Sequence, residues 1–245
     1  MSISCEDNNI KIWDVNNWEC ILNLTNINKI GYLYSSCFLK QNNDIYIITS
    51  NCYNNGKSES MKIFDFKEQK IKEINNSNEK TYFIDTYNDN IISKNYIITG
   101  NKNYSKSYDY ENNSIYHKYD DDNNKYLISS IIINNENGII QLIQSCSDGI
   151  IRIFNFHSAL LLKKIKIYNR ILFGLCLWND NYLFVGCKDK TIKMVDLKKG
   201  LIVSNLNSHN DIVLTVKKII HPEYGECLIS QNYAESEIKL WINDI

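Results

Sequence analysis

The feature that most constrains this fold is a short segment that occurs six times at nearly regular spacing. Each copy combines a polar turn, an alternating run and, mostly, an aromatic residue followed by Asp or Asn. The copies are NNIKIWDV (8–15), SESMKIFDF (58–66), NYSKSYDY (103–110), DGIIRIFNF (148–156), DKTIKMVDL (189–197) and ESEIKLWIN (235–243). Their aligned positions, spaced by 51, 44, 46, 41 and 46 residues, are Trp13, Phe64, Tyr108, Phe154, Val195 and Trp241. Self-similarity at this period predicts a repeat architecture.

Within each copy the side chains alternate with a period of two, which is typical of a strand. In IKIWDV, for example, Ile10 and Ile12 share one side while Lys11 and Trp13 share the other. Three further apolar runs accompany each copy, and no amphipathic helix is evident. Four short strands per period is the content of a propeller blade. The sequence therefore predicts an all-β fold, a β-propeller of about six repeats in a single domain (1–245), with repeats ending near residues 15, 66, 110, 156, 197 and 243.

These segments resemble the WD-repeat β-propeller family. IKIWDV and EIKLWIN are similar to its signature strand, and SDGIIRIF and KDKTIKMVD to the Asp-containing turn before it. LNSHNDIVLTV is similar to the Gly-His turn of the family, with Ser208 in place of Gly. The resemblance covers nearly the whole chain. It implies a fold and says little about function.

The resemblance also implies a structural network that joins a turn Asp, a His, a Ser or Thr and the signature Trp. The Asp role falls on Asp7, Asp148 and Asp189 and, in the last repeat, on Glu235; the His role falls on His209, and the Trp role on Trp13 and Trp241. No repeat holds the full set, so most blades are expected to depend on apolar packing. His209 could instead be a catalytic base or a ligand, but the structural role is favoured.

Composition limits the partners, metal sites and location that can be expected for the chain. The net charge of −1, from 27 basic and 28 acidic residues, disfavours a nucleic-acid partner. Eight cysteines without a Cys-x-x-Cys pair disfavour a zinc site, so neither a metal nor a cofactor is expected. Cys5, Cys146 and Cys187 each stand two residues before a turn Asp and are predicted to be small buried side chains. With no signal peptide and no apolar run long enough to span a membrane, the chain is expected in the cytoplasm, with the nucleus as an alternative.

Two features of the repeats remain open. The loop 51–60 lengthens its repeat, and it is either a disordered insert or a binding loop. The first repeat lacks an innermost strand and the last lacks an outermost one. We therefore expect either a piece of a longer chain or an incomplete or irregularly closed ring, whose seam can take an edge strand from a partner.

The abundant Asn is interpreted as a turn former that tolerates the left-handed backbone region.

No nucleophile elbow, phosphate-binding glycine loop or His-Glu-x-x-His motif is present. The sequence therefore predicts a non-enzymatic intracellular scaffold whose faces bind peptides or domains of other proteins. A propeller subunit of an RNA or ribonucleoprotein complex is the alternative, with lysines such as Lys163, Lys188 and Lys199 forming a basic face. A hydrolase acting in the channel is a third, weaker hypothesis. The candidate partner-binding residues are Tyr53, Tyr82, Arg170, Lys188 and Tyr233.

Overall fold

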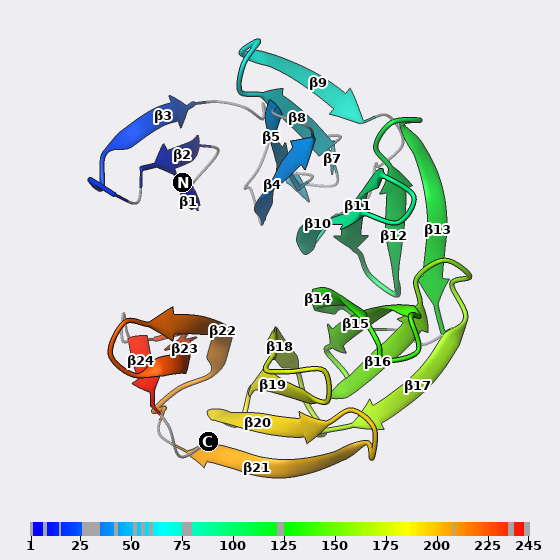
Figure 1. The fold of residues 1–245 in the computed structure, drawn as a ribbon, viewed down its shortest axis with the longest axis vertical. Helices are drawn as coiled ribbons and strands as arrows, with labels where there is room; N and C mark the ends of the chain where they lie inside the picture. The colour runs from blue at the N-terminus through cyan, green and yellow to red at the C-terminus, as the bar shows by residue number, and fades with distance from the viewer. Residues whose placement is uncertain are drawn as a thin grey trace. The chain divides into compact units, whose positions relative to one another are not determined.

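The computed structural model describes residues 2–6, 9–14, 16–25, 35–41, 44–50, 53–54, 57–58, 61–74, 80–121, 125–207, 209–234 and 238–242, with the backbone alone described for 2–6, 53–54 and 57–58. Within these ranges every regular element is a strand (Figure 1). Six antiparallel sheets have three or four strands each, and a seventh is a two-stranded hairpin. This confirms the predicted all-β propeller fold. Over the same part of the chain, no helix has the length and hydropathy that a membrane span requires.

The chain divides into two compact units, Met1–Lys118 and Tyr119–Ile245. Unit 1 contains the sheets β1-β2-β3, β4-β5-β8-β9 and β10-β11-β12-β13 and the hairpin β6-β7. Its strands are β1 (Ser2–Glu6), β2 (Asn9–Trp13), β3 (Cys20–Leu24), β4 (Ser36–Gln41), β5 (Asp44–Thr49), β6 (Tyr53–Asn54), β7 (Lys57–Ser58), β8 (Met61–Asp65), β9 (Lys70–Ile74), β10 (Phe83–Asp89), β11 (Lys94–Gly100), β12 (Tyr104–Asp109) and β13 (Ser114–Asp120), whose last two residues belong to unit 2.

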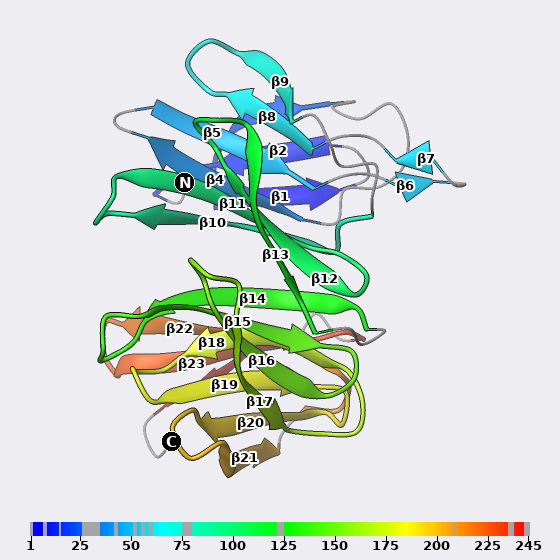
Figure 2. The same ribbon diagram turned by 90° about the vertical axis from the view of Figure 1, so that its right-hand side faces the viewer.

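Unit 2 contains the sheets β14-β15-β16-β17, β18-β19-β20-β21 and β22-β23-β24. Its strands are β14 (Leu127–Asn134), β15 (Ile140–Cys146), β16 (Ile150–Asn155), β17 (Leu161–Lys166), β18 (Leu172–Leu177), β19 (Tyr182–Cys187), β20 (Thr191–Asp196), β21 (Leu201–Asn207), β22 (Val213–His221), β23 (Gly225–Asn232) and β24 (Ile238–Trp241). Because neighbours in each sheet are consecutive and antiparallel, alternate turns emerge at opposite ends of the strands. Figure 2 shows the β14–β15 and β18–β19 turns at the same end.

The six repeated segments form β2, β8, β12, β16, β20 and β24, one in each of the larger sheets. Within the described ranges, the first sheet has no strand inside β1 and the last has none outside β24, as expected. The long loop 51–60 contains the β6–β7 hairpin, with Tyr53 opposite Ser58. The prediction of a single domain over residues 1–245 and that of a seam in the ring both concern how the two units are arranged. Both stay predictions.

A side-chain oxygen closes the outer hairpin of each sheet from the first to the fifth. The Asp or Asn just after the aromatic position accepts backbone N–H groups of the following turn. The pairs are Asp14 with Asn16, Asp65 with Lys67 and Glu68, Asp109 with Asn112, Asn155 with Ser158, and Asp196 with Lys199, at 2.8–3.0 Å. Four residues after each acceptor the chain takes a positive φ, at Trp18, Gln69, Asn113, Ala159 and Gly200. The repeated aromatic-Asp pair is therefore a turn signal with a local mechanism.

Asn forms turns as expected, but it supplies left-handed backbone at only two of the described positions. Of the seven described non-glycine residues with positive φ, only Asn103 and Asn113 are asparagines. Asn135 and Asn179 instead accept turn N–H groups with their side chains: Asn135 from Asn137 and Ile139, and Asn179 from Asn181 and Tyr182. Asn acts in these turns mainly as a side-chain acceptor.

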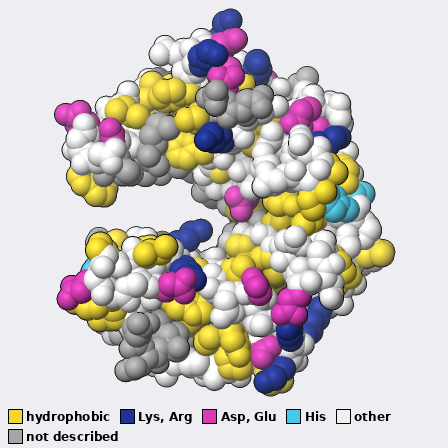
Figure 3. Space-filling model, viewed as in Figure 1, with side chains coloured by type: hydrophobic (Ala, Val, Ile, Leu, Met, Phe, Trp, Pro, Cys, Tyr) yellow, Lys and Arg dark blue, Asp and Glu magenta, His cyan; other side chains and the backbone are white. Residues whose placement is uncertain are grey.

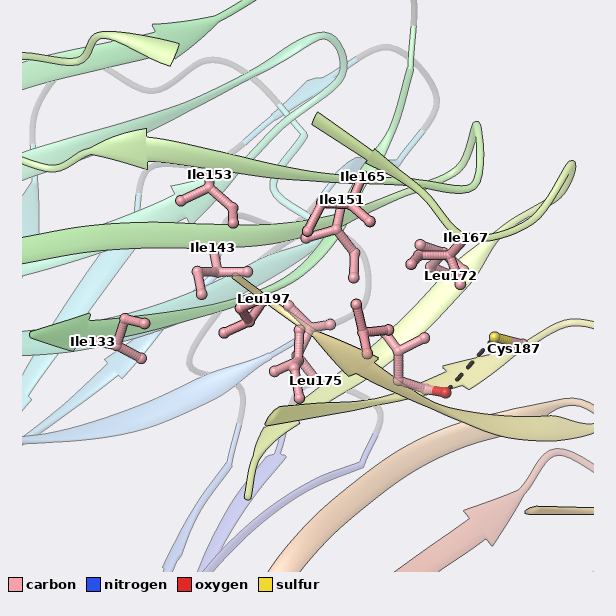
Figure 4. Packing of buried hydrophobic residues seen from close by; sticks show 13 residues of the cluster. Ile133, Ile143, Ile151, Ile153, Ile165, Ile167, Leu172, Leu175, Cys187 and Leu197 are labelled. Carbon is pink, nitrogen blue, oxygen red and sulfur yellow. Dashed lines mark hydrogen bonds between the residues drawn. The ribbon is translucent and has the colours of Figure 1, made fainter. Parts of the chain in front are cut away.

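The core consists of the alternate apolar residues of facing sheets. In unit 2 the largest cluster brings together strands of the β14–β17 and β18–β21 sheets, with Ile143, Ile151, Leu183 and Val185 fully buried. Figure 4 shows how these side chains interdigitate between the two sheets. A second cluster in unit 1 joins the β4–β9 and β10–β13 sheets in the same way. Each sheet is therefore held by its neighbour, as the repeat pattern requires.

Gly138 and Gly149 have nearly the same positive φ but different surroundings. Replacing each by Ala therefore distinguishes the cost of backbone strain from the cost of a steric clash. Gly138 (φ 73°) has open space where a Cβ would lie, whereas a Cβ at Gly149 (φ 76°) would lie 1.9 Å from the carbonyl oxygen of Tyr168. We expect Gly138→Ala to lower the free energy of unfolding by about 1 kcal/mol through backbone strain. Gly149→Ala should lower it by about 1–3 kcal/mol more, since backbone must move. Urea unfolding of both variants measures this, and equal losses would contradict the close approach.

Candidate interaction face

One end of the unit-2 strands collects the connections that carry the predicted binding residues. We call this the loop face and define it by residues 121, 125–126, 147–149, 167–171, 188–190, 209–212 and 233–234. Backbone hydrogen bonds join its connections in pairs: Ser147 to Tyr126, Lys188 to Ile171 and Tyr233 to Ile212, at 2.9–3.2 Å. Arg170, Lys188 and Tyr233, which lie far apart in the sequence, therefore share one face of unit 2.

The three side chains are available on this face. Tyr233 is 73% exposed, Arg170 is exposed and Lys188 is partly exposed. Within the part of the chain that the structure describes, neither Arg170 nor Lys188 makes a side-chain hydrogen bond or ion pair. A cation and an aromatic ring without internal partners are the groups that most often anchor protein interfaces.

The other two candidates lie in unit 1. Tyr82 precedes β10, donates its N–H to the carbonyl of Gly100 and has the ammonium of Lys80 5.1 Å from its ring centre. Tyr53 lies in β6, and its side chain is outside the described residues. The position of Tyr82 next to a turn matches the prediction, while Lys80 already occupies part of its ring surface.

Asp148, predicted as a turn carboxylate, is paired with a buried arginine of its own strand. Arg152 is 1% exposed, and its two terminal nitrogens donate to the two carboxylate oxygens of Asp148 at 2.9 and 2.6 Å. Burial alone would raise the pKa of Asp148, but the hydrogen bonds and charge of Arg152 reverse this and lower it. Lys166 adds a hydrogen bond to the Asp148 carbonyl at 2.8 Å. The turn is thus fixed by charge-assisted bonds.

A second carboxylate completes this network. The side chain of Asp121 is 1% exposed and accepts a hydrogen bond from Nε of Arg152 at 2.6 Å. Lys125, also buried, pairs with the same carboxylate, and Lys164 lies 2.8 Å from it. Burying such charges is unfavourable unless each is paired and hydrogen-bonded. The network therefore ties the connection before β14 to the strands β16 and β17.

In the β18–β21 sheet the turn carboxylate pairs with a buried lysine instead of an arginine. Asp189 accepts hydrogen bonds from the hydroxyl and N–H of Thr191 and lies 2.9 Å from the ammonium of Lys193. Lys193 is 8% exposed and also bonds Asn205 at 3.2 Å. Burial opposes ionisation of Asp189, but these partners lower its pKa. Lys193 therefore links the turn to the outer strand β21.

Sequence reasoning identified the turn carboxylates but not their partners. A basic residue stands four positions after each of them, in DGIIR and DKTIK. This Asp-x-x-x-Arg/Lys spacing could have indicated the ion pairs, because it places a cation on the strand that follows the turn carboxylate. No role was predicted for Arg152, and both Arg152 and Lys193 are buried.

The last sheet contains the predicted histidine. His209 is 7% exposed, and its Nε2 lies 2.6 Å from the hydroxyl of Ser230, which also accepts a hydrogen bond from Nε1 of Trp241 at 2.8 Å. The structure therefore brings His209 and Trp241 together on Ser230. Trp13 is partly buried on β2. Asp7 and Glu235, the remaining predicted members, lie outside the described residues.

Of the three cysteines predicted to be buried before a turn Asp, Cys146 and Cys187 are buried as expected. Cys146 and Cys187 are fully buried, and burial is the main cause that raises the pKa of each thiol to about 12. Cys176 is buried on β18, Cys37 is partly buried on β4, and the side chain of Cys5 lies outside the described residues. Over the described ranges, no group of His, Cys, Asp or Glu side chains has metal-binding geometry.

In comparisons with known proteins, no protein-family model matches this chain and no similar curated protein was found.

The Asp148–Arg152 pair predicts a pH-dependent contribution to stability. Because the folded-state pKa of Asp148 is lowered, its contribution is present above the unfolded-state value, about pH 4, and is lost as pH falls through the folded-state value. Asp148→Asn should lower the free energy of unfolding by about 1–2 kcal/mol at pH 7. The difference from the wild type should shrink below about pH 4.

Denaturant unfolding across this pH range makes the comparison. Glu223→Gln, at an exposed carboxylate on the β22–β23 turn, is the control and should leave the pH dependence unchanged. A loss for Asp148→Asn that stays constant from neutral to acid pH would contradict the ionic pairing.

The geometry around Ser230 predicts a structural role for His209. His209→Ala should lower the free energy of unfolding by about 1–3 kcal/mol, since it leaves buried polar groups without their partner. Ser230→Ala should cause a similar loss, and the double variant should lose less than the sum because the three side chains form one network. Full stability of the His209 variant, or strict additivity, would argue against this role.

Proposed function

We propose that this chain is a non-catalytic scaffold that binds other proteins, with the loop face of unit 2 as its principal binding surface. The observation that carries the proposal is the position of Arg170, Lys188 and Tyr233 on three neighbouring connections of one face. Ion pairs inside the strands fix the turns next to them. A surface whose anchors are already ordered loses less conformational entropy on binding.

The state of the reactive side chains supports a non-catalytic role. The thiols of Cys146 and Cys187 are buried and their pKa values are raised, so they are poor nucleophiles. His209 is buried and already engaged by Ser230. Asp148 and Asp189 are held in ion pairs with lowered pKa values, the opposite of what a general acid at neutral pH requires.

Charge favours a protein partner over RNA. On the loop face Lys190 is hydrogen-bonded to a backbone carbonyl, and on the adjoining strand β17 Lys166 bonds the Asp148 carbonyl and Lys164 pairs with Asp121. Figure 3 shows the opposite end of the unit-2 strands, where side chains of both signs are interspersed with hydrophobic ones. An RNA-binding surface instead needs a continuous basic stripe. The RNA-associated subunit is the alternative proposal.

We also propose membership of the WD-repeat family and a cytoplasmic location. Family membership is supported by the turns that an Asp or Asn side chain closes in five sheets, three of them after an aromatic-Asp pair, and by the His209–Ser230–Trp241 contacts. The free thiols of the six cysteines whose side chains are described support a reducing compartment, which the nucleus would also satisfy.

A strand from a partner is part of the same proposal. The four-stranded sheets have an outer strand beside the repeated segment, whereas β24 has none within the described ranges. Ile238, Leu240 and Ile242 are 66%, 40% and 46% exposed along this edge. An apolar edge with free backbone groups favours addition of an extended strand.

Affinity purification from cells that express the protein tests the loop face. The wild type is compared with Arg170→Glu/Lys188→Glu/Tyr233→Ser and with the charge-matched surface control Lys72→Glu/Lys217→Glu/Tyr224→Ser, whose three residues are exposed outside the loop face. We expect proteins that are recovered with the wild type and the control but at least about tenfold depleted with the loop-face variant, which corresponds to about 1.4 kcal/mol. Equal recovery with both variants, or recovery of RNA that survives the loop-face changes, would contradict the proposal.

A further inference from the structure

A hollow of about 270 Å³ lies at the other end of the unit-2 strands, between the β14–β17 and β18–β21 sheets. The turns β14–β15, β18–β19 and β20–β21 and the start of β17 surround it. It is therefore on the face opposite to the loop face of the same unit. At about 30 Å³ per water molecule, the space corresponds to about nine waters.

The floor of the hollow is apolar. It consists of Ile133, Ile153, Leu162 and Leu197, of which Ile133, Ile153 and Leu197 are 8%, 4% and 8% exposed. These three belong to the core cluster of unit 2, and Figure 4 shows Leu197 beside Ile143 and Leu175. A branched aliphatic side chain placed here would continue the packing of the core.

Two contacts between the sheets form the rim. The ammonium of Lys163 donates to the carbonyls of Leu197 and Lys198 at 2.8 and 2.7 Å. Lys198 in turn pairs with Glu136 at 2.6 Å. Both contacts join residues of different sheets, so the rim is built from the two sheets together.

Several polar groups of this hollow lack partners. Within the described ranges, the carboxylate of Asp180 has no cation, and the side-chain amides of Asn137 and Gln141 make no hydrogen bond. The Oδ1 of Asn181 is buried and also lacks a donor. Lys163 balances its charge only with neutral carbonyls. The hollow therefore offers an acceptor group, a donor group and free amides, a set that matches the N–H and C=O groups of a peptide better than a ligand of one charge.

A second hollow lies in unit 1, where several lining side chains bond one another. It is lined by Gln41, Asn88, Asn95 and Glu111 among others. There the side chains satisfy one another: Asn88 donates to Asn95 at 2.8 Å, and Asn95 and Gln41 both donate to Glu111 at 3.2 Å.

Exposed apolar residues extend the unit-2 hollow along two strands. Leu160, Leu161 and Leu162 at the start of β17 are 66%, 38% and 46% exposed. Leu201, Ile202 and Val203 at the start of β21 are 54%, 37% and 45% exposed. Because Phe154 pairs with Leu161 and Val195 with Ile202, these are equivalent positions of adjacent repeats. A linear ligand would find apolar surface beyond the hollow, whereas a small molecule would not use it.

We propose that this hollow binds an extended peptide segment of a partner protein. A Leu or Ile side chain of the peptide packs on the floor, and its apolar neighbours cover the exposed residues of β17 and β21. Peptide N–H groups donate to Asp180 and to Asn181 after rotation of its amide, and peptide carbonyls accept from Gln141 and Lys163. The inference rests on the proposed function of binding proteins, and it uses a different face from Arg170 and Lys188.

Methyl NMR on the 245-residue chain, labelled at Ile and Leu, tests the site. The probe is Ac-Ser-Leu-Ile-Leu-Ser-NH2, and the comparison ligands are the all-serine pentapeptide and free leucine. We expect saturable shifts of the Ile133, Ile153 and Leu162 methyl signals with the probe alone, while Leu228 in the β22–β24 sheet stays unchanged. Gln141→Ala/Asp180→Ala should weaken binding about tenfold, since two hydrogen bonds are lost. Leu162→Glu should abolish it, and Arg170→Ala should have no effect.

The proposal is overturned if the probe causes no saturable shift, if the all-serine peptide binds equally well, or if free leucine binds as tightly as the probe, which would indicate a small-molecule site. It is also overturned if the Gln141/Asp180 variant binds like the wild type. Its failure is separable from that of the proposed function. Loss of captured proteins on changing the loop face does not depend on this hollow, and peptide binding here does not depend on Arg170 or Lys188.

Discussion

The structure depends on a side-chain oxygen at the end of five of the six repeated strands. Asp14, Asp65, Asp109, Asn155 and Asp196 each accept N–H groups of the turn that follows and thereby close the hairpin to the outer strand. The bond is local, so it forms without reference to the rest of the fold. Repeated at a period of about 45 residues, it defines where each sheet ends and how its outer strand pairs. The core clusters then form between sheets whose edges are already set.

Unit 2 adds a second constraint, ion pairs buried inside the sheets. Arg152 bridges Asp148 and Asp121, and Lys193 bridges Asp189 and Asn205. Ion pairs of this kind contribute little net stability, because desolvation offsets the attraction. Their effect is on geometry, since each charge has few arrangements in which it is satisfied. They hold the turns of the loop face in place, and Arg170 and Lys188 stand beside those turns.

Features that residues close in sequence determine could be predicted from the sequence. Features that depend on how the sheets pack together could not. The six strands follow from alternation and from the aromatic-Asp pair, and the buried Cys146 and Cys187 follow from their equivalent positions before the turn Asp. The burial of Arg152 and Lys193 was not predicted, because it depends on the carboxylates that meet them in the folded sheet. The hollow could not be predicted at all: it joins turns from Asn135 to Lys198, which meet only because two sheets pack side by side.

The central claim is that buried ion pairs fix the turns of the loop face. Amide hydrogen exchange of the whole chain tests it most directly. The N–H groups of Ile150 and Thr191 are bonded to Asp148 and Asp189, while that of Asn137, on an exposed turn at the opposite end of the strands, is bonded to the side chain of Asn135. The account predicts that Ile150 and Thr191 exchange at rates close to those of the neighbouring strand amides, and far more slowly than Asn137. Exchange of Ile150 and Thr191 as fast as that of Asn137 would contradict it.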